Sequence, residues 1–454
     1  MSMKAIEALS TFGAGLQYDD LPAEVVEQSK RFLLDAVGCA YAAYKEDPKK
    51  ALIATKIATG FGRGSAVVIN GGLTHPTAAA LANGILINAA DNDDTHKRAL
   101  AHIGSVVVPA ALAAAMANHI NVRDFIVALV VGYEVTARVG MSVMPTHYRF
   151  WHSTATNGTF GAAAAAARAW QLAPQQMRMV LGFAGTQAAG LNAFFESGDD
   201  SKSVHPGKAA MNGLLAAMLT EYGATSPPDI FEHPKGYLAA YSLEPKPEML
   251  DSGLGQTWEI LQNGFKLYPS ILASHSPIGA TLEILSKQNI NPSEVKSVEV
   301  RTYATVKSHF SSKDIGNSMA ARLSVPYCVA AALVDGQIKQ QQFSVERIGD
   351  PAIKEMLQKV EIIADPELTP LYPEKFPARV IVRLNNGQVH EATFMYPKGD
   401  PQNPLSKDEL VSKFRENLDG VVSSDHSDTI LSHVSDLENI KFEDLAKVLA
   451  KQAN

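Results

Sequence analysis

The chain has 454 residues, of which 46% are hydrophobic and 19% charged, and its formal net charge is −7. This composition is typical of a globular protein with a large core, and the interspersed acids and bases form no charge block that would indicate a nucleic-acid or membrane partner. Cys39 and Cys328 lie in apolar runs and cannot form a disulfide framework or a thiolate zinc site. Without a signal-peptide pattern or an uninterrupted apolar run of ~18 residues, we expect a cytoplasmic protein.

The first half of the chain predicts helices. Residues 22–44 have Pro near their start, acids in the first turn and apolar residues at helical spacing. The same pattern recurs over residues 76–90, 105–119, 123–139, 158–171, 175–190 and 206–222. Helices that are apolar nearly all round are buried, so we expect a large helical domain over residues 1–265 in which outer helices enclose central ones.

The pattern changes after about residue 290. Residues 295–306 and 359–365 are β-branched and strand-like, and residues 378–396 form two such runs joined by Asn385-Asn386-Gly387, a strong hairpin signal. A helix over residues 324–336 lies between them. We therefore expect a smaller α+β domain over residues 266–400, followed by amphipathic C-terminal helices over residues 401–454 that return to the helical domain.

Residues 89–102, AADNDDTHKRALAH, form a dense cluster of acidic residues and histidines. This stretch lies between two Ala-rich helical segments and contains Asp91, Asp93, Asp94, Thr95, His96 and His102. Charges are costly to bury unless they are paired or used, so the segment is a candidate site in which carboxylates and imidazoles move protons. Alternatively, some of the acids only cap the next helix and His102 is a satisfied core histidine. The Gly and Glu of a calcium loop are missing, and we expect no metal.

Three further polar segments precede Ala-rich or apolar helices. Residues 198–213 place Lys202 and His205 in a Gly-flanked loop, where they suit an anion, or where they form a solvated helix cap. Removal of Lys202 from such a loop should leave the core intact. Residues 147–161 contain His152, and residues 266–277 contain Lys266 and His275. We expect these segments to converge on one cavity. The chain lacks the G-x-G-x-x-G, G-x-S-x-G and H-E-x-x-H motifs.

These segments resemble the MmgE/PrpD family of lyases and isomerases. The matching blocks run in the family's order from about residue 5 to residue 450. They are D-x-D-D-T-H…H followed by V-V-P-A-A-L-A from Asp91 onward, K-x-x-H-x-G-x-A-A from Lys202, K-x-Y-P followed by a His from Lys266 to His275, and A-x-x-S-x-P-Y from Ala321 to Tyr327.

The resemblance implies a mainly α fold, with a large helical domain, a smaller α+β lid domain and a homodimer. Known members include 2-methylcitrate dehydratase, cis-aconitate decarboxylase and iminodisuccinate epimerase, which work on small polycarboxylates without a bound metal or organic cofactor. It also implies an active site lined by Asp91, Thr95, His102, His152, Lys202 and Tyr327. One departure concerns Ser270-Ile271-Leu272. Many relatives have C-C-R there, and the animal decarboxylase has a further catalytic His, which weakens a decarboxylase assignment.

We therefore expect a cofactor-independent lyase, a dehydratase or decarboxylase, that acts on a small di- or tricarboxylate between the two domains. Lys202 and Arg98 would hold carboxylates, and His102, His152 or Asp91 would move the proton. Tyr327 would orient the substrate or donate a proton from the lid. Further substrate contacts are expected from Thr95, His205, Lys266 and His275. The alternatives are an epimerase of a dicarboxylate such as iminodisuccinate and a catalytically silent carboxylate-binding protein.

Overall fold

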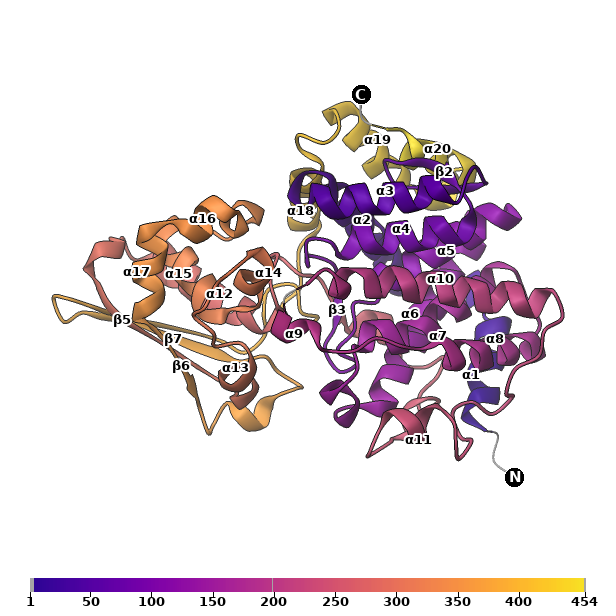
Figure 1. Ribbon diagram of the computed structural model, residues 1–454, viewed down its shortest axis with the longest axis horizontal. Helices are drawn as coiled ribbons and strands as arrows, with labels where there is room; N and C mark the ends of the chain where they lie inside the picture. Colours follow the sequence, from indigo (N-terminus) through magenta and orange to yellow (C-terminus); the bar gives the residue numbers. More distant parts are fainter. Residues whose placement is uncertain (1–3, 198, 453–454) are drawn as a thin grey trace. The chain divides into compact units, whose positions relative to one another are not determined.

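The computed structural model describes residues 4–197 and 199–452, so residues 1–3, 198, 453 and 454 of the predicted domains lie outside the described residues. The chain divides into two compact units (Figure 1). The first comprises Met1–Asn263 and Ser406–Asn454, and the second comprises Gly264–Leu405. This is a mostly helical fold with a smaller mixed-sheet domain, as the sequence predicts.

The first unit is helical. Its helices are α1 (Ala5–Gly15), α2 (Ala23–Glu46), α3 (Pro48–Gly60), α4 (Pro76–Asn88), α5 (Gly104–Asn118), α6 (Val122–Val143), α7 (Ser153–Ala169), α8 (Pro174–Gln187), α9 (Phe194–Ser197), α10 (Ser201–Glu221), α11 (Tyr237–Tyr241), α18 (Lys407–Leu418), α19 (Ser424–Ser435) and α20 (Phe442–Ala450). Short strands are β1 (Ala66–Val68), β2 (Gly72–Thr74), which pairs antiparallel with β1, and β3 (Thr95–His96). Strand β4 (Asn263–Gly264) lies where the two units divide.

The centre of this unit consists of α5, α6 and α7. Every residue of α7 is buried, which its Ala-rich sequence allows. Helix α6 is the one helix in the described part of the chain that is long and apolar enough to cross a membrane. Its apolar window is entirely buried inside the structure, which is typical of a core helix.

Two glycines bring α4 and α10 together. A Cβ at Gly84 would lie 2.5 Å from Cα of Gly207, so neither position accepts a larger side chain without a shift of the backbone. The sequence predicts a helix that begins at residue 206, but this helix, α10, begins at Ser201 and contains Pro206 in its interior. A Pro is most typical of the first helical turn, which explains the error. As a result, Lys202 and His205 lie on a helix and not in the predicted loop.

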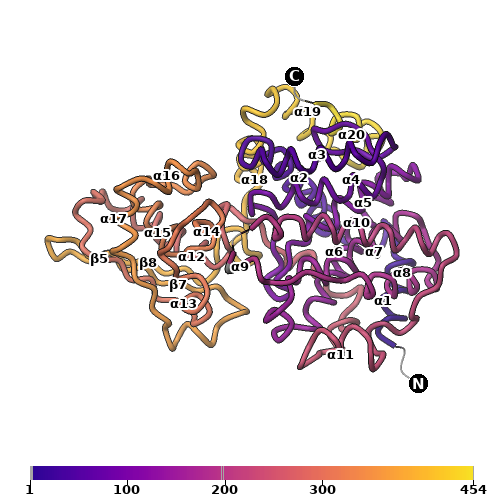
Figure 2. The backbone as a smooth tube through the Cα atoms, viewed as in Figure 1, coloured from indigo at the N-terminus to yellow at the C-terminus, as the bar shows by residue number. Residues whose placement is uncertain are grey.

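The C-terminal segment packs within the first unit. Helix α18 packs against α2, α19 packs against α20 and α2, and α20 contacts β1. Figure 2 shows these helices, in yellow, beside the indigo N-terminal helices, with which they share one packed unit. Residues more than 300 positions apart in the sequence therefore meet here.

The second unit contains a four-stranded sheet in the order β6-β5-β7-β8. Strand β5 (Val295–Thr302) pairs parallel with β6 (Val360–Ala364) and antiparallel with β7 (Ala378–Leu384), and β8 (Val389–Phe394) pairs antiparallel with β7. The predicted hairpin is confirmed, with Gly387 at a φ of +87° in its turn. The helices are α12 (Leu272–Lys287), α13 (Ala304–His309), α14 (Ser318–Leu323), α15 (Val325–Asp335), α16 (Val345–Gly349) and α17 (Pro351–Lys359).

Candidate active site

The segment that follows α4, residues 89–94, is called the acidic loop below. It turns through Asp91, whose φ of +53° lies in the left-handed region that Asp tolerates better than most residues. Asp91, Asn92, Asp93 and Asp94 are each at most 5% exposed. Three buried carboxylates in four positions require strong local compensation, which the surrounding helices supply.

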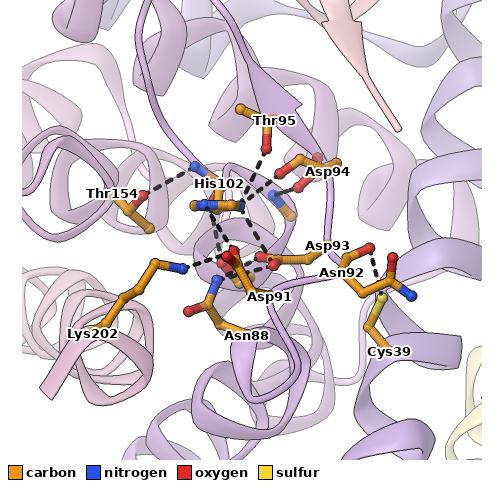
Figure 3. Close-up of polar contacts among 12 residues, drawn as sticks. Cys39, Asn88, Asp91, Asn92, Asp93, Asp94, Thr95, His102, Thr154 and Lys202 are labelled. Carbon is orange, nitrogen blue, oxygen red and sulfur yellow. Dashed lines mark hydrogen bonds and ion pairs between the residues drawn. The ribbon is translucent and has the colours of Figure 1, made fainter. Parts of the chain in front are cut away.

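Asp91 forms an ion pair with Lys202. The ammonium Nζ donates to Asp91 Oδ1 at 2.7 Å, and both side chains are almost completely buried (Figure 3). The close crossing of α4 and α10 brings these two residues together although they are 111 positions apart. The structure therefore places a fixed positive charge beside the loop, at which a carboxylate substrate could be held.

His102 lies two residues before α5 and contacts the acidic loop on both edges of its ring (Figure 3). Its Nδ1 is 3.0 Å from the carbonyl oxygen of Asp94. A carbonyl can only accept, so Nδ1 carries the hydrogen in the neutral ring. Nε2, which is 3.6 Å from Asp91 Oδ1, is then the ring nitrogen that carries the lone pair and can accept a proton.

Other groups fix this orientation of His102. Thr95 Oγ1 and Asp93 Oδ1 lie 3.3 and 3.4 Å from Nδ1. The backbone N–H of His102 donates to Thr154 Oγ1 at 3.0 Å. Asn88 in turn donates to both carboxylate oxygens of Asp93, at 2.9 and 3.0 Å. The carboxylates of Asp91 and Asp93 thus lie on the two sides of the His102 ring.

Asp94 anchors the loop to the protein interior. Its oxygens accept from Gly104 N at 2.8 Å, from the Tyr133 hydroxyl at 2.7 Å and from Asn263 Nδ2 at 2.5 Å. Burial, with the nearby charge of Asp93, raises the pKa of Asp94 to about 7. Gly104 is the first residue of α5, so Asp94 binds the N-terminus of this helix. The alternative prediction that an acid of this segment caps the next helix therefore fits Asp94.

His152 and His205 form a second pair. Their Nδ1 atoms are 3.1 Å apart, and the ring of Phe194 packs edge-on against His152 at 5.0 Å. Burial and the neighbouring cations lower the pKa of His152 well below 6.5 and that of His205 to about 4, so both rings are neutral at pH 7. His152 lies two residues before Thr154, which accepts from the backbone N–H of His102, and the charges of Lys202 and His102 contribute to the lowered pKa of His152.

The remaining predicted residues have partners of their own. Arg98 donates to both carboxylate oxygens of Glu259 at 2.8 and 2.7 Å. In the second unit, Lys266 and His275 are buried, and His275 Nε2 lies 3.3 Å from the carbonyl of Ser270. The Tyr327 hydroxyl donates to the carbonyl of Gln342 in the same unit. The prediction that Arg98, Lys266, His275 and Tyr327 contact the substrate stays a prediction.

Sequence reasoning missed several supporting residues. Tyr133 and Asn263 lie in segments that show no motif, whereas Thr154 lies in the polar segment of residues 147–161, in which only His152 is a candidate. Each of the three donates or accepts one hydrogen bond in the cluster. Only the polar character of Tyr133 within the apolar run of α6 could have indicated that residue, because a buried hydroxyl needs a partner.

One group of side chains has the composition of a metal site. Asp91, Asp93 and His102 each offer a ligand atom, and these atoms lie within 4.8 Å of one another. The fit is poor, because the Lys202 ammonium already binds Asp91 Oδ1 and a divalent ion there would face that positive charge at close range. The Lys202 ammonium therefore disfavours a divalent cation at Asp91, and the expected absence of a metal stays a prediction.

Comparison with known proteins gives matches along nearly the whole chain. The MmgE/PrpD N-terminal domain matches residues 7–250, and the MmgE/PrpD C-terminal domain matches residues 268–439. The cis-aconitate decarboxylase-like protein oryM of Aspergillus oryzae is 30% identical over 467 residues, which cover 96% of this chain and 94% of that protein. The cis-aconitate decarboxylase of Aspergillus terreus is 28% identical, with 94% and 91% covered, and that of Homo sapiens is 27% identical, with 97% and 93% covered.

Proposed function

The chain belongs to the MmgE/PrpD family, and from this premise we propose that it is a lyase that acts on a small di- or tricarboxylate without a bound cofactor. The observation that carries the proposal is the buried cluster of Asp91, His102 and Lys202. It combines a fixed cation with an imidazole whose Nε2 can exchange a proton. The names of the relatives make cis-aconitate the first substrate to test.

The chemistry follows from the positions of these groups. Lys202 would hold a substrate carboxylate, and negative charge that develops at the adjacent carbon would be stabilised by the same ammonium. In a decarboxylation, the carbon–carbon bond to the departing CO2 leaves its electron pair on that carbon, and protonated His102 would then donate a proton from Nε2. In a dehydration, neutral His102 would remove the proton from carbon and an acid would protonate the leaving hydroxyl.

An epimerase is the second candidate, because two histidines lie near the same lysine. His102 and His152 could exchange protons with opposite faces of one carbon, which an epimerisation requires. The neutral state of His152 at pH 7 is compatible with such a role as a base.

Proton NMR of purified protein incubated with cis-aconitate, 2-methylcitrate and iminodisuccinate, in excess EDTA, tests the proposal. Loss of CO2 or water from one of them supports the lyase, and chiral analysis that shows inversion without loss of mass identifies the epimerase. Saturable binding without any conversion would contradict both activities and indicate a carboxylate-binding protein. A homodimer, the remaining part of the proposal, would be seen as a mass of twice 48.7 kDa in light scattering.

A further inference from the structure

A second buried lysine contacts the acidic loop, and it comes from the C-terminal part of the chain. Lys413 on α18 donates from Nζ to Asp35 Oδ1 on α2 at 2.6 Å and to the carbonyl oxygen of Asn92 at 2.7 Å. Lys413 and Asp35 are 6% and 3% exposed. We propose that Lys413 is a positioning residue for the catalytic groups and acts through the Asn92 carbonyl. This inference rests on the proposed function of the Asp91–His102–Lys202 cluster.

The contact between Lys413 and the Asn92 carbonyl lies in the middle of the acidic loop. Asn92 lies between Asp91 and Asp93, so an anchor at its carbonyl fixes the peptide plane that joins the two halves of the loop. Asp91 then meets Lys202, and Asp93 meets His102, on either side of that anchor. A displacement of reacting groups by 1 Å can lower turnover by ~10²-fold, so a backbone anchor outside the substrate site can control the rate.

The carbonyl of Asn92 is held by two donors. The thiol of Cys39, which lies on α2 like Asp35, is 3.4 Å from the same oxygen. The loop also has an anchor at its beginning, where Lys50 donates from Nζ to the carbonyl of Ala89 at 3.2 Å. Lys50 and Lys413 thus bind backbone oxygens of the loop, whereas Lys202 binds a side chain that faces the proposed chemistry. This difference separates a positioning role from a catalytic one.

A lysine suits this position because the anchor must also offset negative charge. Burial raises the pKa of Asp35, and the ammonium of Lys413 opposes that rise and favours the carboxylate form. The charge of Asp93 also raises the pKa of both Asp35 and Lys413. A neutral donor would hold the Asn92 carbonyl but leave Asp35 and Asp93 without a shared counter-charge.

The test compares variants that separate the backbone anchor from the charge pair. Lys413→Met alone leaves a buried carboxylate and can fail to fold, so the informative variant is the neutral double variant Asp35→Asn/Lys413→Met. We expect the double variant to keep a cooperative thermal transition but to lower kcat for cis-aconitate by about 10-fold to 100-fold, with KM changed less than about threefold, because Lys202 still holds the substrate. Asp35→Asn alone, which retains the lysine at the Asn92 carbonyl, should be more active than the double variant. Lys413→Arg, which keeps a charged donor at this position, should retain part of the kcat that the double variant loses.

A matched control is available on the same two helices. Lys45 of α2 donates to the carbonyls of Glu416 and Asp419 at the end of α18, at 2.6 and 2.9 Å, and touches no part of the acidic loop in these contacts. Lys45→Met should therefore leave kcat unchanged. If Lys45→Met and the double variant lower kcat equally, helix packing explains the effect and the inference is wrong.

A spectroscopic measurement separates this inference from the proposed function. In protein with 15N-labelled histidine, the Nδ1–H signal of His102, assigned by its loss in His102→Gln, reports the hydrogen bond to the Asp94 carbonyl. The signal should shift in the double variant and stay in place in Lys45→Met, while the Nδ1–H of His147, which donates to Tyr241, stays in place in both. This result would support the inference even if no carboxylate is converted. An unchanged His102 signal together with a wild-type kcat would overturn it.

Discussion

Replacing Lys202 with Met removes the ammonium that donates to the buried carboxylate of Asp91. Two unit charges 2.7 Å apart attract each other by about 6 kcal/mol at an effective dielectric constant of 20. Breaking one partner of a buried pair typically destabilises a protein by ~3–5 kcal/mol, since the remaining charge stays out of water. We therefore expect Lys202→Met to lose ~3–5 kcal/mol of unfolding free energy at pH 7, besides its loss of turnover.

The neutral double variant Asp91→Asn/Lys202→Met is the control for this effect. It removes both charges and should recover most of the lost stability, while turnover stays low because the cation and the carboxylate are both gone. Urea unfolding followed by circular dichroism measures the stability of the single and double variants, and NMR measures conversion of cis-aconitate. If Lys202→Met is as stable as the wild type, Lys202 does not form a buried ion pair with Asp91. The prediction from the sequence alone, that Lys202 lies in a loop, would then be the better one.

Three further predictions follow from the cluster and the second unit. The pKa of Asp94 rises from 3.8 to about 7 on folding, so the folded chain retains a proton that the unfolded chain releases between these values. The unfolding free energy should thus fall as pH rises from about 4 to 7, and Asp94→Asn should reduce that fall in urea titrations; an identical pH slope would argue against the raised pKa. Activity should survive exhaustive chelation, and full loss with EDTA that one divalent ion restores would instead support a metal at the acidic loop. Tyr327→Phe should lower turnover with the thermal transition retained, whereas wild-type turnover would limit Tyr327 to its hydrogen bond with Gln342.

The sequence predicts the elements better than their contacts. Apolar periodicity identifies the buried helices, and β-branched runs with Asn385-Asn386-Gly387 identify the hairpin of the second unit. The parallel pairing of β5 with β6 is not predictable from local pattern, because it depends on a connection of more than 50 residues. The start of α10 is misplaced because Pro206 lies inside the helix, and this error moves Lys202 from the helix into a loop.

For the candidate site, too, the sequence predicts residues better than their contacts. The density of acids and histidines indicates the acidic loop, because such groups are rarely placed among apolar helices without a use. Nothing in the sequence indicates Lys413, since it lies in an amphipathic helix whose other charges are mostly exposed. Its burial depends on the packing of α18 against α2, which joins residues 378 positions apart. Long-range anchors of this kind require a structure.

The most direct test of the proposed chemistry is incubation of wild-type protein and His102→Gln with cis-aconitate in D2O, followed by proton NMR. The wild type should convert the substrate and place one deuterium on the carbon next to the remaining carboxylate. His102→Gln should bind cis-aconitate in calorimetry but convert it at least about 10²-fold more slowly, since Gln has no titrating nitrogen. Equal rates of deuterium incorporation in the two proteins would contradict the assignment of proton transfer to His102.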